Sequence, residues 1–235
     1  MGYQELHTEF SNLGFLTRGG FYPVEADGIP VLSAGEKAKS VLMVGNVGSR
    51  DFWKQFTLSE EYLSEKSDPM DLWTKRVIGL VADKFGGEAL FPSDGPPYHP
   101  FQQWASRAEQ LYPSPIGLFV SPKWGTWHAL RAAIIFPDII EGFPGLEQVK
   151  SPCLECKGQP CLSACPVEAF APDKMYDYLG CAKHITSDAG QDCAHNGCLA
   201  RRLCPVGQDY TLNPEHAEFH MSAFIKARRD AGEIE

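Results

Sequence analysis

All eight cysteines of the 235-residue chain lie between Cys153 and Cys204, and none precedes Cys153. Such a dense group of thiols is linked by disulfides or by metal, depending on the redox compartment. The first thirty residues lack the basic start and apolar run of a secretory signal, and no apolar run is long enough to cross a membrane. We therefore expect a cytoplasmic protein with no membrane partner, whose cysteines bind metal.

The first four cysteines form a recognisable run, Cys153-x2-Cys156-x4-Cys161-x3-Cys165-Pro. It is close to the C-x2-C-x2-C-x3-C-P run of bacterial ferredoxins, with a longer central gap. In two-cluster ferredoxins, three cysteines of the run bind one cluster and the fourth binds the other. The run therefore predicts two iron–sulfur clusters, both of the [4Fe–4S] type.

The remaining four cysteines complete both predicted clusters, and Cys204-Pro205 repeats the Cys-Pro ending. The crossing pattern predicts Cys153, Cys156, Cys161 and Cys204 as ligands of cluster one, and Cys165, Cys181, Cys193 and Cys198 as ligands of cluster two. Structural zinc is the alternative, since four-cysteine zinc sites also use C-x2-C pairs. Two Cys-Pro endings are not a feature of zinc ribbons and favour iron–sulfur clusters.

The cysteines also divide the chain. A turn-rich segment, Glu141-Gly142-Phe143-Pro144-Gly145, precedes them, so we expect a linker at about residues 141–150 and two domains, 1–147 and 148–235. The formal net charge of −9 and the pI of 5.3 disfavour a nucleic-acid partner, because binding to phosphate backbones depends on clustered Lys and Arg.

The first domain has the pattern of a mixed α and β fold. The apolar run Val41–Val44 predicts a strand that ends in a turn at residues 45–48. Ser67-Asp68-Pro69 predicts a helix start and Gly86-Gly87 its end. Its expected core stripe is Met70, Trp73, Val77, Leu80, Val81 and Phe85. Further expected elements are a helix over 98–110, strands over 116–120 and 126–136, and a last helix from Asn213 to Arg229.

Two family resemblances follow from these residues. The order of the cysteines, with one in Cys181-Ala-Lys-His-Ile, resembles the double-cluster module of epoxyqueuosine reductases and reductive dehalogenases. The first domain resembles the cobalamin-processing CblC family in Ser67–Asp71, around Tyr98-His99, and above all in residues 121–131, SPKWGTWHALR. That last segment is similar to the family's His-Pro-Arg-Phe-Gly-Gly-Trp-Phe-Ala-Ile-Arg.

The resemblances imply an α+β fold, with a flavin-reductase or nitroreductase-like domain that binds a corrinoid and a small ferredoxin-like two-cluster domain after it. The corrinoid would bind base-off, because the chain has no Asp-x-His-x-x-Gly motif. Arg131 matches an arginine that binds the glutathione carboxylate in CblC proteins. The implied pocket residues are Tyr98, His99, Lys123, Trp124, Trp127 and Arg131.

The departures from both families shape the functional hypothesis. CblC's C-terminal arginines have no counterpart, so electrons would arrive through the clusters from a ferredoxin or flavodoxin type donor of low potential. The Asp-containing segment and helical repeats of epoxyqueuosine reductases are absent, as is the export signal of reductive dehalogenases. Tyr98 and Lys123 are the candidate acids. We expect a corrinoid reductase or upper-ligand remover; the alternative is a non-enzymatic electron carrier that docks a redox partner.

Overall fold

The computed structural model describes residues 2–48, 50–64, 66–171 and 175–235. The contacts between residues divide the chain into two compact units. Unit 1 comprises Met1–Gln110 and His128–Gln148, and unit 2 comprises Leu111–Trp127 and Val149–Glu235. The sequence-based division placed residues 111–127 with the first domain. By its contacts this segment groups with the cysteine-rich part of the chain, so the motif of residues 121–131 contributes to both units.

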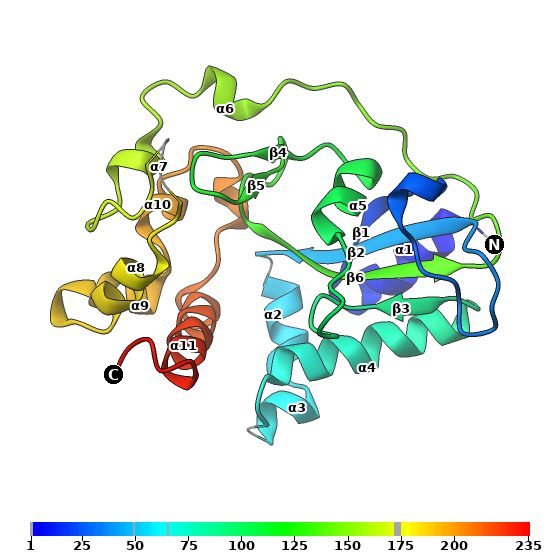
Figure 1. Cartoon of the computed structure of the whole chain (residues 1–235), viewed down its shortest axis with the longest axis horizontal. Coiled ribbons are helices and arrows are strands. Elements are labelled where there is room, and N and C mark those ends of the chain that lie inside the picture. Colours follow the sequence, from blue (N-terminus) through cyan, green and yellow to red (C-terminus); the bar gives the residue numbers. More distant parts are fainter. Residues whose placement is uncertain (1, 49, 65, 172–174) are drawn as a thin grey trace. The chain divides into compact units, whose positions relative to one another are not determined.

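Unit 1 contains an antiparallel sheet in the order β1-β2-β6-β3 (Figure 1). The strands are β1 (Leu16–Phe21), β2 (Ser40–Val47), β3 (Glu88–Leu90) and β6 (His128–Phe136). The predicted strand at Val41–Val44 is confirmed as β2, but the expected turn at 45–48 is wrong, because the strand continues to Val47. A bulge at Gly45 lets the strand continue through this glycine. A Cβ there would lie 2.2 Å from the carbonyl oxygen of Ala129, so the glycine allows close strand pairing.

Helices pack on this sheet and bury an aromatic core. They are α1 (Tyr3–Asn12), α2 (Arg50–Thr57), α3 (Glu60–Leu63), α4 (Pro69–Lys84) and α5 (Phe101–Ala108), with a 3-10 turn at Glu25–Asp27. Within the core, the ring of Trp73 stacks on Phe15 at 4.9 Å between centroids and meets Phe52 edge-on at 5.3 Å. Every residue of β2 is buried, so both faces of the central strand are covered.

The predicted helix that starts at Pro69 is confirmed as α4, and α5 lies within the helix predicted over 98–110. Asp68 occupies the N-cap position in a left-handed conformation and forms no side-chain capping bond. The prediction that Leu80 belongs to the core stripe is wrong, since this residue is 62% exposed. Ile78 and Ala82 are buried instead, because the inward-facing stripe of α4 is offset from the one predicted.

Unit 2 joins a two-stranded hairpin to a series of mostly short helices (Figure 1). The hairpin pairs β4 (Tyr112–Pro113) with β5 (Phe119–Val120). The helices are α6 (Pro152–Glu155), α7 (Pro160–Ser163), α8 (Tyr178–Ile185), α9 (Gln191–Asn196), α10 (Leu199–Arg202) and α11 (Pro214–Asp230), with 3-10 turns at Asp188–Gly190 and Gln208–Tyr210. The predicted last helix is confirmed as α11, which Asn213 caps by accepting the His216 N–H at 2.8 Å.

The mixed helix and strand content agrees with the predicted α+β class, while the ferredoxin-like character of the second part stays a prediction. Among the helices that the structure describes, none has both the length and the apolar character that crossing a membrane requires.

Candidate functional site

Four cysteines of unit 2 line one cavity. Cys153 lies in α6 and Cys156 directly after it, Cys161 lies in α7, and Cys204 follows α10. Burial raises the pKa of the Cys153 and Cys161 thiols, and the neighbouring Cys204 thiol raises both pKa values further. Thiols that raise one another's pKa values lie close together. Their deprotonation is favoured only when a positively charged group binds to them. Short helices thus gather residues that the sequence spreads over a long segment.

Two hydroxyl groups in the same cavity have no partner. Ser114 and Thr126 line the cavity, and their side-chain oxygens are buried without a hydrogen bond among the described residues. Leaving a buried hydroxyl unsatisfied costs about 1–3 kcal/mol. The sulfurs of a bound iron–sulfur cluster would accept both hydrogen bonds. This donor set therefore fits the predicted group.

The other four cysteines form a second group in unit 2. Burial raises the pKa values of Cys181 and Cys198, and Cys165 and Cys193 raise both further. No thiol of the first group contributes to either shift among the described residues. The grouping by proximity follows the predicted ligand sets. The binding of iron by these sets stays a prediction.

Hydrogen-bond donors surround this second group. The Ala169 N–H donates to the Cys165 sulfur at 3.3 Å, and the Ala200 and Arg201 N–H groups donate to the Cys198 sulfur. The Tyr176 hydroxyl donates to Cys181. Donors to sulfur stabilise the thiolate form, which is the form that binds iron. The donors to Cys181 and Cys198 offset part of the effect of burial on the pKa values of these two thiols.

In the described ranges, no three His, Cys, Asp or Glu side chains are arranged to hold a single metal ion. A [4Fe–4S] cluster makes a different demand, because each of its four thiolates binds a separate iron atom and the sulfurs surround the cluster. Two groups of four thiols meet that demand. One group lines a cavity, and hydrogen-bond donors are directed at the sulfurs of the other group. The residues present therefore fit two clusters.

A separate polar site lies in unit 1 around Arg131 of β6. Its Nε donates to the Oδ1 of the buried Asn46 at 2.7 Å, and its guanidinium lies 5.4 Å from the centroid of the Phe52 ring. Its Nη2 is buried and has no hydrogen-bond partner among the described residues. Burial lowers the pKa of Arg131 to about 10, although the carboxylate of Asp71 opposes this. The guanidinium therefore retains an unused donor.

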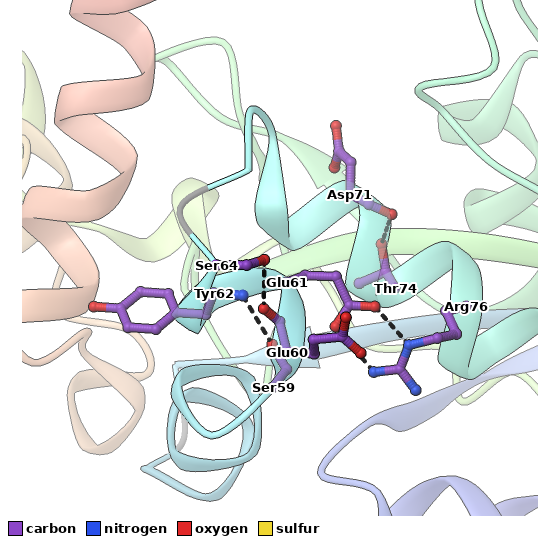
Figure 2. A network of polar contacts seen from close by, with 8 residues as sticks. All are labelled: Ser59, Glu60, Glu61, Tyr62, Ser64, Asp71, Thr74 and Arg76. Carbon is purple, nitrogen blue, oxygen red and sulfur yellow. Dashed lines mark hydrogen bonds and ion pairs between the residues drawn. The ribbon is translucent and has the colours of Figure 1, made fainter.

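Arg131 and Asp71 share a solvent-open cavity of about 350 Å³ with Thr74, Pro92, Ser93 and Leu130. Burial raises the pKa of Asp71, and Arg131 acts in the opposite direction. Figure 2 shows the Asp71 carboxylate pointing away from the Glu61–Arg76 ion pair of the same region. The cavity thus combines a cation with a carboxyl group that holds its proton more tightly than usual. In the sequence, Asp71 had only a place in the Ser67–Asp71 resemblance, so its position in this cavity was not predicted.

Two of the other predicted pocket residues lie in unit 1. Tyr98 is 74% exposed. The ring of His99 stacks on Trp104 at 5.3 Å, and the Trp104 indole donates to the carbonyl oxygen of Asp27 at 2.8 Å. His99 therefore has a packing partner in unit 1, and Tyr98 presents its ring to solvent.

The remaining three lie in unit 2. Lys123 is exposed, with its Nζ 5.3 Å from the centroid of the Trp124 ring. Trp127 is buried, and its indole nitrogen has no hydrogen-bond partner among the described residues. The six residues predicted to line the corrinoid pocket thus divide between the two units, and a pocket that they share stays a prediction.

Comparison with solved structures identifies the fold. The chain resembles the B12-trafficking protein CblC of C. elegans, a homologue of human MMACHC, with a TM-score of 0.51 and 14% identity over 94% of this chain and 93% of that chain. The chain has a CblC-like fold. Epoxyqueuosine reductase of Bacillus subtilis matches more weakly, with a TM-score of 0.40 and 14% identity over 92% of this chain and 69% of that chain.

A structure of epoxyqueuosine reductase with an epoxyqueuosine-modified tRNA-Tyr stem loop gives the same TM-score of 0.40. No protein-family model matches the sequence, and no curated protein matches it. The resemblance to CblC is therefore a likeness of fold.

Proposed function

We propose that this protein is an iron–sulfur redox protein in which two [4Fe–4S] clusters deliver electrons to a corrinoid, as a corrinoid reductase or upper-ligand remover. The observation that carries the proposal is the gathering of eight cysteines into two groups of four. The ligands would be Cys153, Cys156, Cys161 and Cys204 for cluster one, and Cys165, Cys181, Cys193 and Cys198 for cluster two. When bound, the clusters supply single electrons at low potential.

The corrinoid part of the proposal rests on unit 1 and on the fold. The C. elegans structure with this fold is a B12-trafficking protein. The cavity of Asp71 and Arg131 offers what a ligand exchange at cobalt needs from a protein. The free Nη2 of Arg131 would bind an anionic group of the corrinoid or of its upper ligand, and Asp71 would protonate the departing ligand.

A non-enzymatic electron carrier is the second candidate. The same two groups of thiols support it, because it needs only the clusters and a docking face for a donor and an acceptor. It gives no reason for the unpartnered donor of Arg131 in a cavity of unit 1. We therefore place it second.

The deciding experiment is anaerobic reconstitution with iron and sulfide, followed by titration with base-on cob(II)alamin under EPR. The proposal expects about eight irons per chain, the content of two [4Fe–4S] clusters, and a change of the cobalt signal to the base-off form. The same iron content with an unchanged cobalt signal would favour the electron carrier. One or two zinc ions with no iron would overturn the cluster assignment.

A matched pair of variants tests the role of the cavity. Arg131→Gln removes the free guanidinium donor, so we expect weaker cob(II)alamin binding with unchanged iron content. Arg107→Gln is the control, because Arg107 pairs with Asp27 and carries the same charge in the same unit. Equal affinities for the two variants would exclude Arg131 from the binding site.

A further inference from the structure

Two hydroxyl residues of unit 2, Thr126 and Ser114, line the cavity of the first cysteine group. The hydroxyl oxygens of both are buried, and neither has a hydrogen-bond partner within the described part of the chain. Apart from Gln159, the other side chains of this wall are cysteines, prolines, valines and one isoleucine. A buried hydroxyl without an acceptor is costly, so both hydroxyls call for an acceptor that the occupant of the cavity would supply.

The backbone of Thr126 is tied to that of a predicted ligand of cluster one. The Nε of Arg201 donates to the carbonyl oxygen of Thr126 at 3.0 Å, and its Nη2 donates to the same oxygen. The carbonyl oxygen of Arg201 in turn accepts the Cys204 N–H at 3.2 Å. The guanidinium also lies 4.6 Å from the centroid of the Trp127 ring, which fixes its plane. Arg201 therefore holds Thr126 in a set position relative to Cys204.

Ser114 is held by the hairpin of unit 2. It directly follows β4, and its N–H donates to the carbonyl oxygen of Leu118 at 2.9 Å. Its own carbonyl oxygen accepts the Gly117 N–H at 3.0 Å. Backbone bonds thus fix both hydroxyl residues, so little conformational freedom is lost when the hydroxyls bond to an occupant of the cavity.

We infer that the hydroxyls of Thr126 and Ser114 donate hydrogen bonds to sulfurs of cluster one and raise its reduction potential, and that Arg201 positions Thr126 for this. The inference rests on the proposed function, since it requires that cluster one be bound. The low-potential donor protein loses one electron and the cluster gains it, while the hydroxyls keep their protons. A donor to sulfur stabilises the more negative, reduced cluster more than the oxidised one, so the potential rises.

The test is an EPR-monitored redox titration of the reconstituted protein. Thr126→Val keeps the shape of the side chain and removes the hydroxyl, so we expect one of the two midpoint potentials to fall. Ser114→Ala should lower the same potential, and the double variant should lower it further. The potential that moves should be the one that is absent from a Cys161→Ser/Cys204→Ser protein. Two wild-type potentials in a fully loaded Thr126→Val/Ser114→Ala protein would overturn the inference.

Thr186→Val is the matched control in the same unit. The Thr186 hydroxyl donates to the carbonyl oxygens of Ala182 and Lys183, both at 3.1 Å, so this variant also loses a hydroxyl. The potential of cluster one should stay at its wild-type value in the control. A fall equal to that of Thr126→Val would count against the inference. Thr126→Ser keeps a hydroxyl and should lie closer to wild type than Thr126→Val.

Electron–nuclear double resonance of the reduced protein in D2O separates a lost hydrogen bond from a changed cavity. It detects exchangeable protons beside the cluster, so Thr126→Val should lack one coupling that the wild-type protein shows. A lower potential with all couplings retained would overturn the inference. If Thr126→Val fails to bind iron, Ser114→Ala is decided by the same two measurements.

Arg201→Lys tests the positioning role, because it keeps the charge and loses the two-donor contact with Thr126. We expect a smaller fall in the potential of cluster one, and no further fall when Arg201→Lys is added to Thr126→Val. An equal fall in both backgrounds would show that Arg201 does not act through the Thr126 hydroxyl. Failure of the wild-type protein to bind iron would instead overturn the proposed function.

Discussion

Gly125 and Gly207 pack backbone against backbone within unit 2. A Cβ on Gly125 would lie 2.0 Å from the carbonyl oxygen of Val206, and a Cβ on Gly207 would lie 2.4 Å from the carbonyl carbon of Trp124. Both glycines have positive φ angles, 58° and 74°. No side chain fits at either position, so the turn that ends at Gly125 lies directly on the segment that follows Cys204. This contact ties the tryptophan motif to a predicted ligand of cluster one.

Gly125→Ala should therefore disrupt cluster one. The new methyl group collides with backbone that cannot move without displacing Cys204, and the positive φ adds a cost of about 1 kcal/mol. We expect the iron content after reconstitution to fall by half, with one EPR signal lost.

Gly117→Ala is the control for this prediction. Gly117 also has a positive φ, 77°, but a Cβ there would have nothing within 4 Å. It therefore measures the backbone strain alone, and its iron content should match wild type. Equal iron contents in the two variants would show that the glycine contact does not support the cluster.

The crossing of the cysteines can be tested with double variants. Cys161 and Cys165 lie four residues apart in the sequence but belong to different predicted clusters. Cys161→Ser with Cys204→Ser should lose only cluster one, since both residues would bind it. Cys161→Ser with Cys165→Ser should lose both clusters. Iron and sulfide analysis after reconstitution distinguishes the two results. Loss of both clusters in the first double variant would contradict the predicted ligand sets.

Tyr176 should raise the potential of cluster two. Its hydroxyl donates to Cys181, and burial raises the pKa of Tyr176 above its usual value, so the hydroxyl keeps its proton. Hydrogen bonds to the sulfurs are one determinant of a cluster's potential. Tyr176→Phe removes the hydrogen bond to Cys181 and should lower the potential of cluster two in a redox titration. Tyr178→Phe is the control, because the Tyr178 hydroxyl bonds to Glu233 at 3.2 Å. An equal shift in both variants would count against the prediction.

The ion pair of Glu61 and Arg76 makes stability depend on pH. The Arg76 side chain donates to both carboxylate oxygens of Glu61, at 2.5 and 2.9 Å (Figure 2). These bonds lower the pKa of Glu61 to about 2. Because the pKa is lower in the folded state, the stabilisation is full above the unfolded pKa of about 4.3 and is lost as the pH falls towards 2.

Glu61→Gln should therefore lower the free energy of unfolding at neutral pH by about 1–2 kcal/mol, a value that allows for the half-exposed Arg76. The difference from wild type should shrink between pH 4.5 and 2 as the wild-type carboxylate takes up a proton. Urea denaturation at several pH values measures this. Glu36→Gln is the control, since Glu36 is exposed and is not among the charges that act on Arg76. A difference that stays constant down to pH 2 would rule out the ion pair as its source.

Local signals in the sequence predicted part of this structure well. The Asp68-Pro69 start of α4, the Asn213-Pro214 start of α11 and the apolar run in β2 are each decided by neighbouring residues, and the structure contains all three. The unit to which residues 111–127 belong was not predicted, because only packing decides it. The Asp71–Arg131 cavity was missed for the same reason, since these residues are far apart in the sequence.

The sequence by itself determined which residues are predicted to bind iron, because thiol count, spacing and the Cys-Pro endings are properties of the chain that need no coordinates. The tertiary structure decided what surrounds them. Only folding brings the carbonyl oxygen of Thr126 and the ring of Trp127 to the guanidinium of Arg201, because these residues lie far apart in the sequence. Such an environment arises from contacts between distant segments, and no periodicity or spacing in the sequence encodes them.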